Sequence, residues 1–441
     1  MTAPSTANLA GYFTRLERGQ PWCWEGHVLE SLGLTVESAG PVASVGESCL
    51  IHDRQQRTHL AEVIGFRGNH LLTMPIDTTE GIQYGDTVSA LGLRPVVGVG
   101  PALIGRVLNA LGEPIDDVMP MSATGCEPLD GLVRSPMDRT PIRDALGTGI
   151  RAIDALLTVG RGQRVGIFGG SGVGKSTLIG MMTRNTEADV TVVGLVGERG
   201  REVGEFLEDS LGVEGRARSV VVVSTSDQSP LLRLRAALVA TTIAESFAAE
   251  GKNVLLVLDS LTRFAMAARE IGLAAGEPPT NKGYTPSVFT RLARLIERAG
   301  QFRSGSITAF YTVLMEGDDQ QDPLVDAVRA LLDGHIVLSR DLAAEGWYPP
   351  IQILDSISRL MPAVALPGHR EHAALVRRLM AVYARSEDLV RIGAYRPGSD
   401  PDLDRAIRAR DSMRSFLIQS TDQQPTLSDS VSQLAEFAGE I

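Results

Sequence analysis

A glycine-rich segment near the middle of the chain has the residue types and the spacing needed to hold a phosphate chain. The segment fits the pattern GxxxxGK[S/T] at every fixed position, and it comprises Gly169, Gly170, Ser171, Gly172, Val173, Gly174, Lys175 and Ser176. Glycines let successive backbone N–H groups turn inward on phosphate oxygens, and the start of a following helix adds its positive end. We therefore expect Lys175 to reach the β- and γ-phosphates of ATP, Ser176 to ligate Mg²⁺, and Thr177 to complete the nucleotide-binding set.

Asp259 is a second candidate ligand for Mg²⁺. It ends an apolar run at residues 254–258, and a carboxylate at the end of a buried strand downstream of a phosphate loop holds Mg²⁺ directly or through water. Many buried strands end in aspartate, so this pattern indicates a metal ligand only in combination with the glycine-rich segment.

Glu198 is the candidate for the chemical step. It ends another apolar run at residues 191–197, so we expect it at the same edge of the sheet as the phosphate loop. A carboxylate there could orient and polarise the water that attacks the γ-phosphate, and Arg199 could touch the same phosphate. The alternative is a surface cluster of salt bridges among Glu198, Arg199, Arg201 and Glu202, and position alone does not decide between the two.

The elements that must position these residues follow an α/β pattern. Strand-like runs occur at residues 164–168, 190–196, 219–224, 253–258 and 306–314, and each is apolar enough to be covered on both faces. Helical stretches alternate with these runs from about residue 95, and the run at 177–183 follows the phosphate loop directly. The pattern predicts an α/β fold, a RecA-like P-loop core with a mainly parallel sheet over residues 93–366.

Three further regions flank this core. Residues 21–92 hold short β-like runs at 48–51, 59–66 and 71–75, separated by Gly, Asn and Asp, which predicts a small β-barrel. Residues 367–441 show only helical patterns, interrupted at 393–401. In residues 1–20 the spacing of Leu9, Tyr12, Phe13 and Leu16 predicts a helix too short to be stable alone. It should serve assembly or partner docking, or else pack on its own domain.

Composition excludes several classes of protein. The 441 residues carry a formal charge of −11 and only 5% aromatic residues, which argues against a nucleic-acid translocase that binds through bases and stacking. No signal peptide is visible, and no segment approaches the roughly 18 uninterrupted apolar residues that span a membrane. The three cysteines form no CxxC pair and are interpreted as small buried residues of a reducing compartment. His369 and His372 are interpreted as a solvated helix start, because no third metal ligand stands nearby.

Several segments resemble a known family. Residues 197–202, with Glu198 and Arg199, resemble the catalytic-glutamate segment of rotary ATPase subunits, and residues 354–359 agree with that superfamily. Within it, the chain is most similar to the flagellar protein-export ATPases of type III secretion systems, from about residue 90 to 410. The segments that carry this similarity are residues 105–112, 278–280, 283–289, 297–300, 311–319, 333–340 and 395–401.

The resemblance implies roles for individual residues. Lys175 and Ser176 would bind phosphate and Mg²⁺, Glu198 would position the hydrolytic water, and Arg199 would lie near the γ-phosphate. Tyr348 sits where the superfamily stacks an aromatic ring on adenine, although a packed aromatic before Pro349 and Pro350 fits the sequence as well. Arg359 sits where one subunit of a ring supplies an arginine finger to its neighbour, and the alternative is a structural ion pair.

The resemblance also implies a function and partners. The chain would be an ATP-hydrolysing subunit of the flagellar export apparatus, forming a hexameric ring in the cytoplasm, peripherally attached to the inner membrane. Its partners would be a regulatory stator protein, a central coiled-coil stalk, membrane proteins of the export gate, and export substrates with their chaperones, but no nucleic acid.

The sequence leaves three alternatives open. One is a virulence-type secretion ATPase. The cysteine-free phosphate loop and the segment Glu316-Gly317-Asp318-Asp319 favour the flagellar type over it. A rotary ATP synthase catalytic subunit is disfavoured because no DELSEED-type acidic segment occurs, and Gly398-Ser399-Asp400-Pro401 is present instead. A nucleotide-binding regulatory subunit with an inactive site is opposed by the intact Lys175, Glu198, Asp259 and Arg359.

Overall fold

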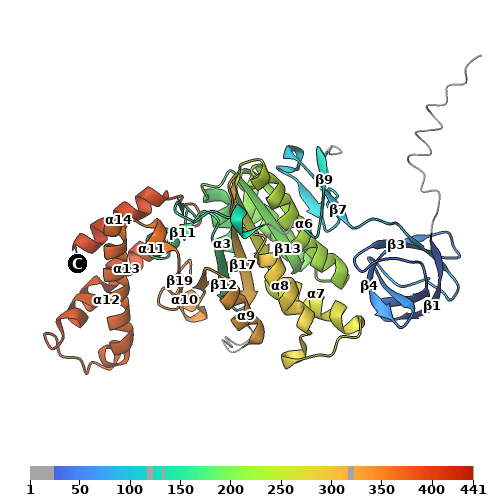
Figure 1. Ribbon diagram of the computed structural model, residues 1–441. Helices are drawn as coiled ribbons and strands as arrows, with labels where there is room; N and C mark the ends of the chain where they lie inside the picture. The colour runs from blue at the N-terminus through green and yellow to red at the C-terminus, as the bar shows by residue number, and fades with distance from the viewer. Residues whose placement is uncertain (1–23, 117–122, 132–134, 316–321, 441) are drawn as a thin grey trace, which may run out of the picture. The chain divides into compact units, whose positions relative to one another are not determined.

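The computed structural model describes residues 24–116, 123–131, 135–315 and 322–440 (Figure 1). The helix expected at residues 1–20 lies outside these ranges. The chain divides into two compact units. One comprises the residues up to Pro95 together with Ala274–Gly276, and the other comprises Val96–Leu273 and Glu277–Ile441.

The first unit is a small closed β-barrel. Its strands follow the order β1-β2-β5-β4-β3-β6, each antiparallel to its neighbours. Alternate side chains point inward, so that Val28, Val36, Ile51 and Val88 form a dry core. The strands are β1 Glu25–Leu32, β2 Thr35–Ala39, β3 Ser48–His52, β4 Thr58–Arg67, β5 His70–Pro75 and β6 Thr87–Ala90.

The second unit is built on a mainly parallel sheet. Its strands lie in the order β19-β18-β12-β17-β15-β13-β14-β8, and only β19 and the short β16 run antiparallel to their neighbours. The strands are β8 Val107–Asn109, β12 Arg164–Gly169, β13 Val190–Glu198, β14 Ser219–Thr225, β15 Asn253–Asp259, β16 Gly300–Gln301, β17 Ser306–Leu314, β18 Gly334–Val337 and β19 Ile357–Ser358. Two smaller pairs, β7 Val96–Val99 with β9 Gly125–Pro128 and β10 Ala145–Leu146 with β11 Val159–Gly160, stand beside this sheet.

Helices cover the sheet, as the apolar strands require. The long α6, Pro230–Ala249, packs on β13, β14 and β15 (Figure 1), and most of its residues are buried. The other helices of this part are α2 Arg151–Leu156, α3 Lys175–Asn185, α4 Gly200–Glu205, the π-helix η3 Phe206–Leu211, α5 Gly212–Ala217, α7 Leu261–Ala274, α8 Pro286–Ile296, α9 Pro323–Leu331, α10 Arg340–Ala344 and α11 Met361–Val364. Three single turns complete it, η1 Pro101–Leu103, η2 Pro136–Asp138 and η4 Asn281–Gly283.

The last part of the chain is helical. It contains α12 Pro367–Arg391, α13 Pro401–Leu417 and α14 Leu427–Glu440, shown in orange to red in Figure 1. The rings of Phe416 and Phe437 stack at 5.7 Å between α13 and α14. The predicted architecture is confirmed: a β-barrel, an α/β core with a mainly parallel sheet, and a helical C-terminal part. No helix of the described residues is long and apolar enough to cross a membrane.

Two smaller predictions were wrong. His369 does lie in the first turn of α12, but it is buried rather than solvated, because its Nε2 lies 2.8 Å from the carbonyl oxygen of Ala155 on α2. Cys49 is buried in the barrel as expected, whereas Cys126 on β9 is exposed.

A buried arginine holds β9 and α6 together. Arg298 donates to both carboxylate oxygens of Glu245 on α6, at 3.0 and 2.6 Å, to the hydroxyl of Thr242 at 2.7 Å, and to the carbonyl of Leu129 at 2.9 Å. The side chains of Arg298 and Glu245 are only 8% and 11% exposed, so neither charge can turn to water for a replacement partner. The pair therefore fixes the segment that follows β9 on the helical layer.

We expect Arg298→Met to lower the free energy of unfolding by about 3–5 kcal/mol, because it leaves a buried carboxylate unpaired. Urea unfolding followed by circular dichroism measures the loss, and adding Glu245→Gln should recover part of it. The control is Arg201→Met, which removes an exposed pair with Glu205 at 2.8 Å and should cost less than about 1 kcal/mol. Equal losses in Arg298→Met and Arg201→Met would contradict the role given to Arg298.

Candidate active site

The glycine-rich segment forms a loop between β12 and α3. Gly172 and Gly174 adopt φ angles of 78° and 92°, a left-handed conformation that glycine adopts at little cost. Gly170 leaves room for a different group, because a Cβ there would stand 2.4 Å from Nη2 of Arg340 and would displace that guanidinium from the loop. The loop thus turns sharply and delivers Lys175 to the first position of α3.

Three strands bring the predicted site residues to one edge of the sheet. β12 ends at Gly169, β13 at Glu198 and β15 at Asp259, and parallel strands share the edge at which they end. A cavity of about 630 Å³ opens at this edge. It is lined by Ser171, Gly172, Gly174, Lys175, Ser176, Thr177, Glu198, Arg199, Glu202, Asp259, Thr262, Arg263, Met266, Leu314, Met315 and Arg340.

The remaining predicted residues lie outside this lining. Gly169, Gly170 and Val173 form the loop behind it, and the side chain of Val173 is buried. Tyr348 lies against the loop, because a Cβ on Gly174 would be 3.7 Å from Cε1 of the Tyr348 ring, which is 48% exposed. Arg359 stands apart from the cavity altogether.

Arg359 lies at the edge of the sheet where the parallel strands begin, opposite to the edge that carries the phosphate loop. Its backbone N–H donates to the carbonyl of Asp333 at 3.0 Å, and Asp333 in turn is level with Arg164 at the start of β12. From there to Gly169 the chain rises about 3.3 Å per residue, so Arg359 is roughly 16 Å along the strand from its own phosphate loop. That separation exceeds the reach of an arginine side chain.

Lys175 and Asp259 are buried in the site, and each is stabilised there by hydrogen bonds and by opposite charges. Nζ of Lys175 donates to the carbonyls of Gly169 and Gly170 at 3.2 and 2.9 Å. Burial lowers the pKa of Lys175, while Asp259 and Glu198 oppose that change. Burial raises the pKa of Asp259, although the hydroxyl of Thr312 donates to its Oδ1 at 2.6 Å and Lys175 also stabilises the carboxylate.

Glu198 lies in a place that disfavours its charged form. Burial, the nearby carboxylate of Asp259 and contact with Glu202 raise the pKa of Glu198 to about 8, and Arg263 partly offsets them. A carboxylate tuned toward neutral pH is a more effective proton acceptor than one of ordinary pKa, provided that it is ionised. The environment of Glu198 therefore suits general-base chemistry.

The surface cluster considered as an alternative for Glu198 also exists in part. Arg199 lies 3.7 Å from Glu202, and Arg201 lies 2.8 Å from Glu205, with both arginine side chains about three-quarters exposed. Glu198 itself lines the cavity beside Lys175 and Asp259. The segment therefore combines one carboxylate that faces the cavity with ion pairs on its outer side.

Sequence reasoning missed two cationic residues of the lining. Arg263 lies in the first turn of α7, and its Nε is buried without a hydrogen-bond partner among the described residues. Arg340, the first residue of α10, reaches Gly170 of the loop. Their positions in the sequence could have indicated them, since each lies in the first turn of a helix that follows a strand ending near this edge. With these two, the lining contains four basic and three acidic side chains, which suits a polyanionic ligand.

The chain matches family models over most of its length. Residues 149–358 match the nucleotide-binding domain of the ATP synthase alpha/beta family, residues 28–92 match the β-barrel domain of that family, and residues 365–436 match the T3SS EscN ATPase C-terminal domain.

Individual proteins are similar over almost the whole chain. The flagellum-specific ATP synthase of Bacillus subtilis is 50% identical over 416 residues, which cover 94% of this chain and 95% of that protein. The type 3 secretion system ATPase of Xanthomonas euvesicatoria is 50% identical over 399 residues, 90% of each. The assembled ATPase EscN of enteropathogenic E. coli, solved in complex with its central stalk EscO, superposes with a TM-score of 0.87 at 42% identity and covers 94% of this chain and 100% of that one.

The chain belongs to the ATP synthase alpha/beta family and, within it, to the ATPases of flagellar and type III secretion systems. The family resemblance and the ATPase activity that the sequence predicted are thereby confirmed.

Glu198→Gln should separate nucleotide binding from chemistry, because an amide keeps the shape of the side chain but cannot accept a proton. We expect nucleotide affinity to stay within about tenfold and kcat to fall by roughly 10²-fold or more. In the unsubstituted protein kcat/KM should rise with pH through about 8, since Glu198 acts only when deprotonated and its pKa is raised. Steady-state kinetics from pH 6 to 9.5 measure both effects.

Glu205→Gln is the matched control, because Glu205 belongs to the exposed pair outside the cavity. It should leave kcat and the pH profile unchanged. Normal hydrolysis by Glu198→Gln, or an unaltered pH step in that variant, would show that the base lies elsewhere.

Proposed function

We propose that this chain hydrolyses ATP as one subunit of a homohexameric ring in the flagellar protein-export apparatus. Hydrolysis would drive the release or unfolding of export substrates and their delivery. The observation that carries the proposal is the convergence of Lys175, Glu198 and Asp259 in one cavity behind a phosphate loop.

Lys175, Ser176 and Asp259 would hold the phosphates and Mg²⁺. Lys175 would exchange its contacts with two loop carbonyls for β- and γ-phosphate oxygens, and the unpaired Nε of Arg263 offers a further donor. No three His, Cys, Asp or Glu side chains gather at a metal site within the described ranges. That fits Mg²⁺, which takes few protein ligands and relies on water and nucleotide phosphates for the rest.

Glu198 would take a proton from the attacking water while Arg199 supports the γ-phosphate. The side chain of Arg199 is three-quarters exposed and its pair with Glu202 is long, at 3.7 Å, so its guanidinium could turn toward a bound nucleotide. The adenine would stack on Tyr348, whose half-exposed ring lies against Gly174.

Arg359 would act on the nucleotide of a neighbouring subunit. It lies at the sheet edge opposite to its own phosphate loop, and no carboxylate of the described residues forms an ion pair with it. A ring of identical subunits related by rotation would bring this edge of one subunit to the cavity of the next. There its charge would stabilise the transferred phosphate.

Other partners follow from the family. The assembled EscN in complex with EscO supports both the ring and a central coiled-coil stalk. A stator protein, export-gate membrane proteins, and substrates with their chaperones complete the proposed set, with the ring in the cytoplasm at the inner membrane. A net charge of −11 supports the exclusion of nucleic acid.

Mixing two inactive variants tests the shared site. Glu198→Gln and Arg359→Ala should each bind nucleotide, assemble, and hydrolyse ATP at a low rate. In mixed rings about a quarter of the interfaces join an intact Glu198 to an intact Arg359, so activity should rise well above that of either parent. ATPase rates are measured after mixed assembly has been verified by native mass spectrometry.

The negative control mixes Arg359→Ala with a chain that carries both substitutions. No interface in those rings has an intact Arg359, so activity should stay at the parental level. If the first mixture also stays there despite verified mixed rings, Arg359 does not act in trans.

Deletion of the gene distinguishes the two secretion systems. We expect loss of filament assembly and motility, restored by the unsubstituted chain and not by Glu198→Gln. Normal motility combined with loss of virulence-type secretion would assign the chain to the other system.

A further inference from the structure

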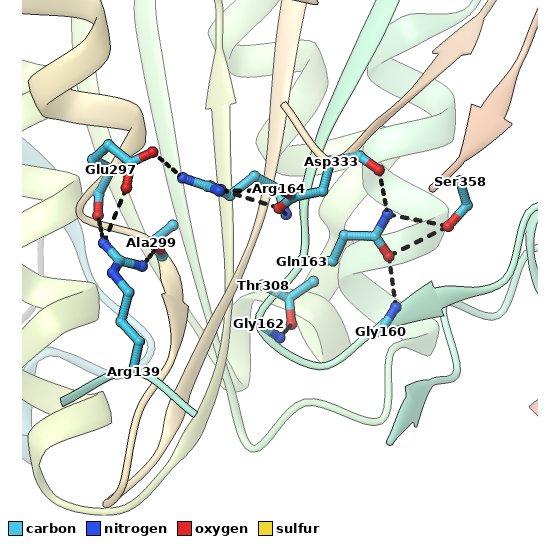
Figure 2. A network of polar contacts seen from close by, with 10 residues as sticks. All are labelled: Arg139, Gly160, Gly162, Gln163, Arg164, Glu297, Ala299, Thr308, Asp333 and Ser358. Atoms are coloured by element: carbon cyan, nitrogen blue, oxygen red, sulfur yellow. Dashed lines mark hydrogen bonds and ion pairs between the residues drawn. The ribbon is translucent and has the colours of Figure 1, made fainter. Parts of the chain in front are cut away.

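Arg359 combines an exposed side chain with a tightly held backbone. It follows β19, in which Ser358 pairs with Gly334 and Ile357 pairs with His335 of β18. Its own N–H is bound to the carbonyl of Asp333, as described above. Figure 2 shows the polar network around Ser358, the residue before Arg359, with Gln163 between Asp333 and Ser358.

Gln163 connects the three chain segments that meet beside Arg359. Its Nε2 donates to the carbonyl of Asp333 at 3.2 Å and to the hydroxyl of Ser358 at 3.1 Å, and its Oε1 accepts from the N–H of Gly160 at 2.8 Å (Figure 2). The hydroxyl of Ser358 donates to the carbonyl of Thr158 at 2.8 Å. Gln163 is completely buried, so water cannot replace these bonds.

Asp333 is fixed from its other side by Arg164. The carboxylate accepts from the backbone N–H of Arg164 at 3.1 Å, from its Nε at 3.0 Å and from its Nη2 at 3.2 Å. Asp333 therefore cannot shift without breaking several bonds to β12. Its carbonyl, which holds both Gln163 and the N–H of Arg359, is correspondingly immobile.

We propose that Gln163 is a positioning residue for Arg359, holding the end of β19 so that the guanidinium reaches the γ-phosphate in the neighbouring subunit. The inference rests on the proposed trans role of Arg359. A finger must be placed within about 0.5 Å to be effective, and buried hydrogen bonds behind it are the usual means. Gln163 supplies them without touching the nucleotide.

The other arm of the network reaches the Arg359 segment only indirectly, through Arg164 and Asp333. Arg139 donates to the carbonyl of Ala299 at 3.0 Å and pairs with Glu297, which also pairs with Arg164. Beside Gln163, the N–H of Gly162 donates to the hydroxyl of Thr308 at 2.8 Å. Thr308 is as deeply buried as the residues around it but makes no contact with Ser358 (Figure 2). It therefore offers a control on the adjacent strand β17, bonded to the same loop.

Gln163→Leu keeps the approximate shape of the side chain and removes its amide. We expect kcat to fall at least tenfold, while KM for ATP and nucleotide affinity change less than about threefold, because the phosphate loop of the same subunit is intact. Thr308→Val removes one buried hydrogen bond next to it and should keep kcat within about twofold. Ser358→Ala is a smaller change and should also lower kcat. It replaces Gln163→Leu in the experiment if that variant fails to assemble.

Mixed rings separate positioning from general damage. A chain with Gln163→Leu still has its own Glu198, so mixing it with Glu198→Gln should restore activity, with about a quarter of the interfaces productive. Mixing it with Arg359→Ala should restore nothing, because neither chain then offers a well-placed Arg359. A merely structural defect would damage the subunit's own cavity, and neither mixture would recover.

The outcomes are distinguishable from a failure of the proposed function. Unchanged kcat in both Gln163→Leu and Ser358→Ala overturns the inference. Recovery of activity when Gln163→Leu is mixed with Arg359→Ala also overturns it. So does a lack of recovery when Gln163→Leu is mixed with Glu198→Gln, provided that the mixture of Glu198→Gln and Arg359→Ala is active. If that last mixture is itself inactive, the trans role of Arg359 fails first.

Discussion

The balance of charge at the carboxyl edge of the sheet is the constraint on which the rest of the structure depends. Glu198 and Asp259 are both withdrawn from water, which raises the pKa of each carboxyl, and repulsion from Asp259 raises the pKa of Glu198 further. Lys175 and Arg263 offset that repulsion only in part. Such an arrangement costs stability, and it persists because the buried strands and α6 fix the three strand ends.

A single strand, β12, lies between the phosphate loop and the segment that carries Arg359. β12 delivers the phosphate loop at its carboxyl end and, through Gln163 and Arg164, anchors the segment of Arg359 near its amino end. The six residues of β12 thus stand between a subunit's own site and Arg359, the residue that it would offer to another subunit under the proposed mechanism. A rigid, doubly buried strand suits this task, since a displacement at one end is carried to the other with little loss.

The sequence predicted those parts of the site that lie next to apolar runs. Glu198 and Asp259 end such runs, and parallel strands share an edge, so their meeting with Lys175 followed from the pattern alone. Arg263, Arg340 and Thr312 do not end apolar runs, and their place depends on how α7, α10 and the neighbouring strand β17 meet at this edge. The burial of His369 likewise depends on Ala155, 214 residues away. The position of Arg359 depends on the register of β18 and β19, which no local spacing reveals.

The order of strands also has a consequence for synthesis on the ribosome. β12 leaves the tunnel long before its two neighbours, β17 and β18, which are supplied by Ser306–Leu314 and Gly334–Val337. A nascent chain that ends before residue 306 can pair β8, β14, β13 and β15, yet it leaves both sides of β12 without backbone partners. The phosphate loop is therefore formed only after most of the chain has been translated. Incomplete polypeptides should neither capture nor consume ATP, and a subunit becomes competent near the time when it is released.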